Sequence, residues 1–178
     1  MKDALTQPFL DHARHMLREV YLPRIARCLA LLSEKEIWWR PHPASNSVGN
    51  LVLHLEGNVR QWTIAGLGGA PDRRERDKEF AAKGPLPRRR LLKQLRETMD
   101  EACGVLAKLT EQDLAIQHSI QGFHPTGLQA VYHVTEHFAY HAGQIILITK
   151  MKRRQDLRFT HLPKRTPKPA TPRRLPAL

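Results

Sequence analysis

Apolar residues recur at intervals of three and four positions in four long segments of the chain. This spacing is the period of an α-helix with one buried face, as Leu51, Leu55 and Val59 illustrate in the second segment. The sequence shows no internal repeat and no alternation of strands with helices. We therefore predict an all-α protein, a four-helix bundle, with helices over residues 5–32, 47–67, 88–109 and 126–152.

Prolines, glycines and small polar residues mark where these helices begin and end. Pro41 and Pro43 exclude a helix before Ser47, whose hydroxyl can cap the start of the second helix. A group of glycines stops that helix, and Pro23 is expected to kink the first one. Residues 71–80 carry charges of both signs, which predicts a solvated loop with internal ion pairs.

The length of 178 residues suits one domain with a single core, and 41% of the residues are hydrophobic. No run approaches the roughly 18 consecutive apolar residues that cross a bilayer. The first residues, Met1 to Leu5, do not have the pattern of a signal peptide. We therefore expect a cytoplasmic protein that does not enter a membrane.

The positive charge of the chain is concentrated at its C-terminal end. The formal net charge is +12, and the residues from Lys150 onward hold ten Lys or Arg against one acid, Asp156. Residues 155–178 are also rich in proline and poor in large apolar groups, which predicts a disordered basic tail after a bundle domain of residues 1–154. The rest of the chain is close to neutral, so nucleic-acid binding would depend on phosphate contacts of this tail without base specificity.

Three histidines, His133, His137 and His141, follow one another at four-residue intervals within the last predicted helix. Four residues are slightly more than one turn, so neighbours in this series project from the same side, with a drift of about 40° per step. We expect one adjacent pair to bind a metal ion and the remaining histidine to be peripheral. A catalytic zinc-type site takes three protein ligands and keeps one position open.

The third ligand must come from another helix, and His54 is the candidate because it lies within an otherwise apolar helical segment. Asn50 and Asn58 flank it one turn to either side. Such a polar stripe could hold a metal-bound water or orient the imidazole. Alternatively, it is a hydrogen-bonded structural strip at the edge of the bundle.

The segment 46–58, which reads NSVGNLVLHLEGN, and the segment 136–145, which reads EHFAYHAGQI, resemble the DinB-like superfamily of metal-binding four-helix bundles. The likeness extends over about residues 5–152. It implies an up-down-down-up bundle, often a homodimer, with a divalent ion such as zinc or nickel held by His54, His137 and His141. His133 then lies outside the ligand set.

The same resemblance implies two classes of function. Some relatives look like metal-dependent transferases that use a low-molecular-weight thiol, and the chain could then be a thiol transferase or hydrolase acting on a small molecule. The alternative is a non-catalytic metal-stabilised bundle or binding protein. The sequence offers no identifiable catalytic acid or base, because Glu56 and Glu136 are expected to point away from the ion. Gln144 is expected to make a polar contact near the site, and Gly143 to allow close helix packing.

Overall fold

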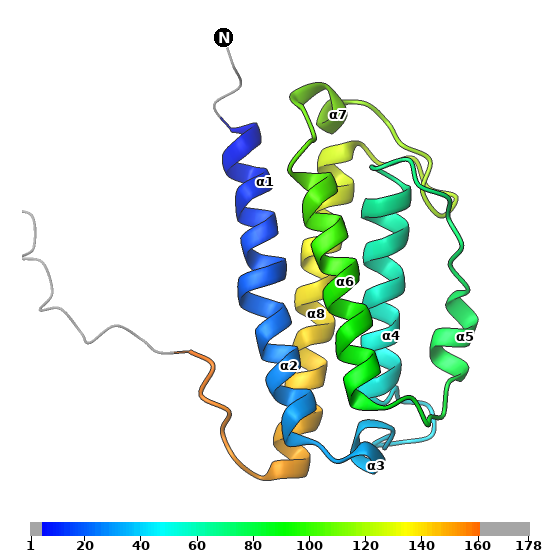
Figure 1. The fold of residues 1–178 in the computed structure, drawn as a ribbon, viewed down its shortest axis with the longest axis vertical. Helices are drawn as coiled ribbons and strands as arrows, with labels where there is room; N and C mark the ends of the chain where they lie inside the picture. The colour runs from blue at the N-terminus through cyan, green and yellow to red at the C-terminus, as the bar shows by residue number, and fades with distance from the viewer. Residues whose placement is uncertain (1–4, 161–178) are drawn as a thin grey trace, which may run out of the picture.

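The computed structural model describes residues 5–160, and these residues are all-helical with no strand (Figure 1). Only two isolated β-bridges occur among them, between Gln117 and Thr126 and between Ile120 and Phe123. Within this described part, no helix is long and apolar enough to span a membrane. The prediction of an all-α protein is therefore confirmed.

The first predicted helix is one continuous helical run with a change of hydrogen-bonding pattern in its middle. It consists of α1 (Thr6–His15), the π-helical segment η1 (Met16–Tyr21) and α2 (Leu22–Leu31). Pro23 lies in the first turn of α2. Proline has no N–H to give to the carbonyl one turn earlier, and the segment directly before α2 is π-helical. The kink expected at Pro23 stays a prediction.

The other three long helices begin close to their predicted residues. Ser47 caps α4 (Val48–Val59) in a capping box with Asn50, and Thr126 caps α8 (Gly127–Arg153) in the same way with Gln129. The second run continues as the π segment η2 (Arg60–Ala65), and the third long helix is α6 (Arg88–Leu106). Three short helices lie in the connections: α3 (Glu34–Ile37), α5 (Arg76–Ala81) and α7 (Glu111–Ala115).

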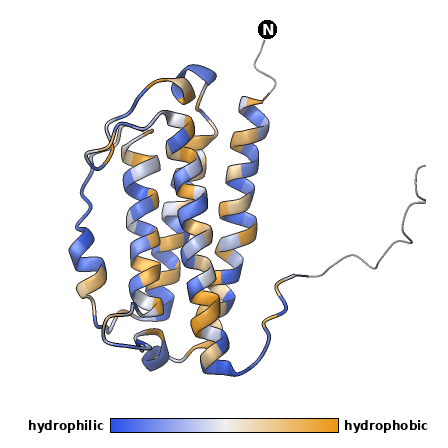
Figure 2. Cartoon of the chain, turned by 180° about the vertical axis from the view of Figure 1, so that it is seen from behind, coloured by the Kyte–Doolittle hydropathy of each residue, from blue (hydrophilic) through white to orange (hydrophobic). Residues whose placement is uncertain are grey.

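The core lies between the four long helical runs, which stand side by side in Figure 1. Helix α4 is central to the packing, because it contacts α6 and α8 and carries α5 on its outer side. Apolar positions recur along each run among hydrophilic ones (Figure 2). Every run supplies fully buried side chains to the core, among them Leu10, Leu17, Ile25, Leu51, Leu55, Leu95, Met99 and Phe138.

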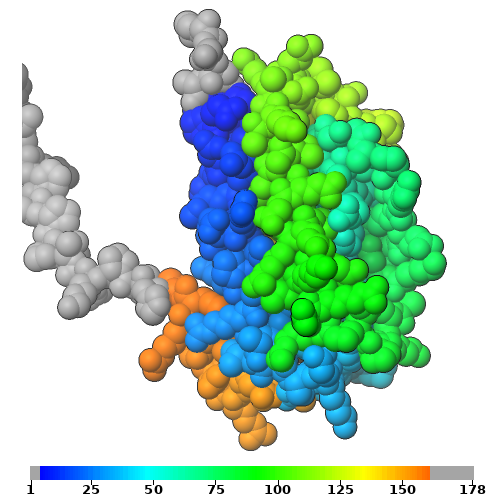
Figure 3. Space-filling view, viewed as in Figure 1, coloured from blue at the N-terminus to red at the C-terminus, as the bar shows by residue number. Residues whose placement is uncertain are grey.

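The chain remains packed on the helices beyond the end of α8. Leu157 is fully buried, and the Phe159 ring lies against the guanidinium groups of Arg24 and Arg27. This segment follows the surface of the first helical run (Figure 3). The tail predicted for residues 155–178 therefore begins with residues that contact the folded part, and the disorder predicted for 161–178 lies outside the described residues.

The prediction of a solvated loop for residues 71–80 was wrong for Arg74 and Glu79. Lys78 and Glu75 do form an exposed ion pair, at 2.7 Å. Arg74 and Glu79, however, are buried against α4, with side chains 4% and 10% exposed. Their burial results from the tertiary contact between this segment and α4, which the local charge pattern does not reveal.

Candidate metal centre

Three of the predicted residues come together where α4 faces α8. His54 projects from α4, and His137 and His141 project from successive turns of α8. The ring centroids are 4.9 Å apart from His54 to each of the others and 4.5 Å apart between His137 and His141. One ligand atom from each ring lies within 4.8 Å of the other two, so the three side chains can hold a metal ion.

The apolar residues next to these histidines determine where the rings lie. His54 is followed by Leu55, and His137 and His141 are followed by Phe138 and Ala142, all of which are buried in the core. One residue turns a helical side chain by about 100°, so the imidazoles lie at the border between the core and the cleft between the two helices. His54 is 5% exposed, whereas the other two rings are half-buried.

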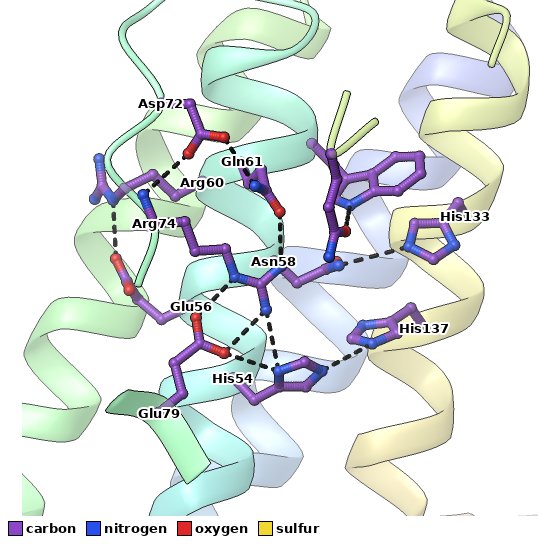
Figure 4. Close-up of polar contacts among 12 residues, drawn as sticks. His54, Glu56, Asn58, Arg60, Gln61, Asp72, Arg74, Glu79, His133 and His137 are labelled. Carbon is purple, nitrogen blue, oxygen red and sulfur yellow. Dashed lines mark hydrogen bonds and ion pairs between the residues drawn. The ribbon is translucent and has the colours of Figure 1, made fainter. Parts of the chain in front are cut away.

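Hydrogen bonds leave the Nε2 atoms facing the centre of the cluster. The Nδ1 of His54 lies 2.9 Å from Glu79 Oε2, and the Nδ1 of His141 lies 2.8 Å from Gln144 Oε1. The Nε2 atoms of His54 and His137 are 3.1 Å apart (Figure 4). Two nitrogens bound at about 2.0–2.1 Å to a tetrahedral ion would be roughly 3.3 Å apart, so this spacing fits a divalent cation with little movement.

The surroundings favour the neutral form of His137 and His141, which is the protonation state that a metal ion requires. Burial and the neighbouring imidazoles lower the pKa of His137 to about 3. Burial also lowers the pKa of His141, although the hydrogen bond with Gln144 acts in the opposite direction. An uncharged imidazole can bind a cation through its unprotonated ring nitrogen and does not repel the ion.

Behind His54 lies an ion pair within residues 71–80 whose burial and contact with the site the sequence interpretation missed. Arg74 donates two hydrogen bonds to Glu79, Nε to Oε1 at 2.7 Å and Nη2 to Oε2 at 2.9 Å. Burial acts to raise the pKa of the Glu79 carboxyl, but the hydrogen bonds from Arg74 and His54 hold it below its usual value. One sequence signal was available, since Gly57 is an unfavourable residue inside a buried helix and marks a close approach by another segment.

The two asparagines of the polar stripe have different roles. Asn50 is fully buried and donates to the carbonyl oxygens of Glu79, at 2.9 Å, and Ala82, at 2.7 Å. Asn58 makes one long contact, from its Nδ2 to the Nε2 of His133 at 3.5 Å. Asn50 thus fastens the segment around α5 to α4, and Asn58 reaches across to α8.

His133 lies one turn along α8 from the cluster and takes no part in the group of three. Its ring packs against the indole of Trp62, with centroids 4.0 Å apart, and burial lowers its pKa. Its centroid is 5.3 Å from that of His137. The expected drift around the helix is consistent with this position, because His133 and His141 differ by about 80° in direction.

The structure also tests what the sequence predicted for two glutamates, Gln144 and Gly143. Glu56 accepts hydrogen bonds from Arg60, at 2.9 Å, and Thr98, at 2.7 Å, away from the histidines (Figure 4), and Glu136 is exposed. Gln144 makes the expected polar contact. The packing role expected for Gly143 was wrong, because a Cβ there would meet no atom within 4 Å.

The arrangement of helices is similar to that of a DinB-like protein from Bacillus cereus ATCC 10987, known from a crystal structure. The two share 14% sequence identity with a TM-score of 0.59, over 76% of this chain and 87% of that chain. The fold is therefore DinB-like, as the sequence resemblance implied.

Residues 4–166 match the family described as protein of unknown function, DUF1572, and the chain belongs to this family. No curated protein matches the chain.

Proposed function

We propose that the protein binds one divalent metal ion, zinc or nickel, through His54, His137 and His141. The observation that carries this proposal is the convergence of three ligand atoms within 4.8 Å, supplied by two helices that pack against each other. Two of the three rings have their outward nitrogen engaged by Glu79 or Gln144, which leaves Nε2 for the ion. Three ligands leave a tetrahedral ion one open position.

We also propose that the four long helical runs form a four-helix bundle of up-down-down-up topology. In Figure 1 the run α1 to α2 and helix α8 descend, whereas α4 and α6 ascend. The connection that contains α5 returns along the bundle, which lets α4 and α6 run in the same direction although they are neighbours in sequence. This topology places α4 beside α8, which the metal site requires.

The first functional candidate is an enzyme acting on a small molecule, a thiol transferase or a hydrolase. A divalent ion at this site supplies a Lewis acid that lowers the pKa of a water molecule or of a low-molecular-weight thiol. The protein's own residues provide three imidazoles whose ligand atoms lie within 4.8 Å of one another. The Phe80 ring, whose centroid is 4.6 Å from that of His54, covers one side of the cluster and restricts the access of water.

The second candidate is a non-catalytic bundle that the ion stabilises, and one observation favours it. Among residues 5–160, each carboxylate considered near the site is already engaged or points away: Glu79 binds Arg74 and His54, and Glu56 binds Arg60 and Thr98. No acid or base in this group is free to transfer a proton to a substrate. The ion would then join α4 to α8 and add its binding energy to folding.

Elemental analysis tests metal binding, on untagged protein purified without chelator. The proposal predicts about one zinc or nickel ion per chain in the parent and none in His141→Ala. Replacement by Co²⁺ then separates the two candidates, because a thiol that enters the open position as thiolate produces a new charge-transfer absorption. A spectrum unchanged by glutathione-sized thiols and by small anions favours the structural role, and absence of metal from the parent rejects both.

A further inference from the structure

Arg74 and Glu79 form a bidentate ion pair on the outer side of α4, and this pair contacts the ligand candidate His54. Both oxygens of Glu79 accept from Arg74, and Oε2 is also 2.9 Å from the Nδ1 of His54. The two side chains are nine-tenths buried or more. A buried ion pair costs desolvation energy and is weak evidence for stability alone, so its direct contact with the ligand candidate needs an explanation.

The contact determines which nitrogen of His54 carries the proton. Two groups lie near Nδ1, namely Glu79 Oε2 at 2.9 Å and Arg74 Nη2 at 3.1 Å. An unprotonated Nδ1 would direct its lone pair at a carboxylate oxygen, which is repulsive, whereas a protonated Nδ1 donates to it. Arg74 Nη2 has two hydrogens and donates one of them to Glu79 Oε2, which is the nearer of the two groups to Nδ1 and carries the full negative charge. The contact with the carboxylate favours the tautomer of His54 with its proton on Nδ1, in which the Nε2 lone pair faces His137.

Several contacts hold Glu79 in this place, although the helix that carries it, α5, is short. Asn50 Nδ2 donates to the carbonyl oxygens at both ends of residues 79–82, and Arg40 Nη2 donates to the Phe80 carbonyl at 2.8 Å. Gly57 permits the approach, because a Cβ there would lie 2.1 Å from Glu79 Oε1. The position of the carboxylate thus depends on two residues of α4, Asn50 and Gly57, and on Arg40.

Arg74 is held in turn from its other side. Its Nη1 donates to Gln61 Oε1 at 2.9 Å, and Gln61 Nε2 donates to Asp72 Oδ2 at 2.8 Å. Asp72 also accepts from the backbone N–H of Arg74 at 3.0 Å, as Figure 4 shows. The chain of contacts from Asp72 through Gln61 and Arg74 to Glu79 ends at the Nδ1 of His54.

We propose that Glu79, held by Arg74, is a positioning residue for the metal centre: it fixes the Nδ1-protonated tautomer of His54 and thereby directs Nε2 at the ion. This inference rests on the proposed role of His54 as a metal ligand. Carboxylates that hold a ligating histidine in this way contribute about 10–100-fold to metal affinity. By thermodynamic reciprocity, a bound ion strengthens the docking of residues 72–82 on α4 by the same factor.

The first test measures the zinc affinity of the full-length protein by competition with a chromophoric chelator. Glu79→Ala is expected to weaken binding 10–100-fold, and Glu79→Gln less, because the amide oxygen still accepts from Nδ1. The control is Glu75→Gln, an exposed residue of the same segment that pairs only with Lys78 among the described contacts, and it is expected to bind as the parent does. Equal affinity of Glu79→Ala and the parent overturns the inference.

The second test needs no metal, since nitrogen-15 NMR of the histidine rings reports the tautomer of His54 in the apo protein. The parent is expected to be protonated on Nδ1, and Glu79→Ala to shift toward the Nε2-protonated form. Gly57→Ala is expected to cause the same shift without altering either partner. A residue with a merely structural role would lower the melting temperature and leave the tautomer unchanged. An Nε2-protonated His54 in the parent overturns the inference.

The two tests keep this inference apart from the function on which it rests. If the parent binds no zinc, the proposed function fails and the positioning role fails with it. If the parent binds zinc and loses it in His141→Ala but not in Glu79→Ala, the metal site stands and this inference alone is overturned. Glu79→Gln, a substitution of nearly equal size, provides the measurement if the alanine variant does not fold.

Discussion

The first layer of side chains between α4 and α8 contains His54, whose two ring nitrogens both have a partner. Nδ1 lies 2.9 Å from Glu79 Oε2, and Nε2 lies 3.1 Å from His137 Nε2. In the next layer, one turn further along α4, Asn58 and His133 share a single contact of 3.5 Å. Among the described residues, each layer also has one buried polar atom without a hydrogen-bond partner, His137 Nδ1 in the first and Asn58 Oδ1 in the second. The same two helices supply both layers. The difference comes from residues 72–82, which reinforce the first layer and not the second.

This comparison shows why a polar residue on a helix does not by itself define a site. Asn50, His54 and Asn58 recur at the same spacing on α4 and are all buried. Asn50 and His54 are joined to the segment around α5 through the carbonyl oxygen and the carboxylate of Glu79. A site with fixed geometry requires such support, because an unsupported ligand loses part of its affinity to its own rearrangement.

The largest expected difference between the layers is in metal affinity. His54→Ala removes one of three ligands and is expected to weaken zinc binding by more than about 100-fold, and His133→Ala is expected to change it by less than about threefold. Isothermal titration with zinc, supported by chelator competition, measures both. Similar losses in the two variants would place His133 among the ligands and contradict the assignment.

A second expected effect, in the first layer, is the pH dependence of stability in the metal-free protein. The pKa of His137 is about 3 in the folded chain and about 6.5 in an unfolded one. Between these values the unfolded state binds more protons, so the free energy of unfolding falls as the pH is lowered from about 6.5 toward 3. Urea unfolding at several pH values is expected to show a shallower fall in His137→Gln, and parallel profiles would contradict the pKa shift.

A smaller contrast is expected between the two asparagines. Asn50→Leu leaves the carbonyl oxygens of Glu79 and Ala82 without donors and removes a helix cap, which costs about 2–3 kcal/mol of unfolding free energy. Asn58→Leu removes one long contact and an unpartnered oxygen, so its effect should stay within about 1 kcal/mol. Chemical unfolding of the metal-free variants measures both. Equal losses would show that the second layer is as tightly built as the first.

The smallest effect is expected at a glycine of α8. Gly143→Ala places a methyl group in open space at an exposed position of α8 and should raise stability by about 0.5–1 kcal/mol. Gly57→Ala, which brings a Cβ within 2.1 Å of Glu79 Oε1, should lower it. Thermal unfolding followed by circular dichroism compares the pair. A loss of stability at Gly143 would indicate a partner surface over that position.

Much of the fold could be predicted from helical periodicity, and most of the candidate metal site could be predicted from the spacing of the histidines. The three-and-four pattern located the long helices, and Ser47 and Thr126 were found at their N-caps. The four-residue spacing of His137 and His141 requires no tertiary information. Glu79 could not be placed in this way, because a helix of six residues with mixed charges has no apolar period, and its burial depends on Gly57 and Asn50, far away in sequence.

The central claim is that three histidines from α4 and α8 hold one ion, and anomalous diffraction from crystals of the full chain grown with zinc tests it most directly. The account predicts a single strong peak within about 2.0–2.1 Å of the Nε2 atoms of His54, His137 and His141. A peak bound by His133 in place of one of these residues would contradict the ligand assignment. Absence of any peak between α4 and α8 would contradict the claim as a whole.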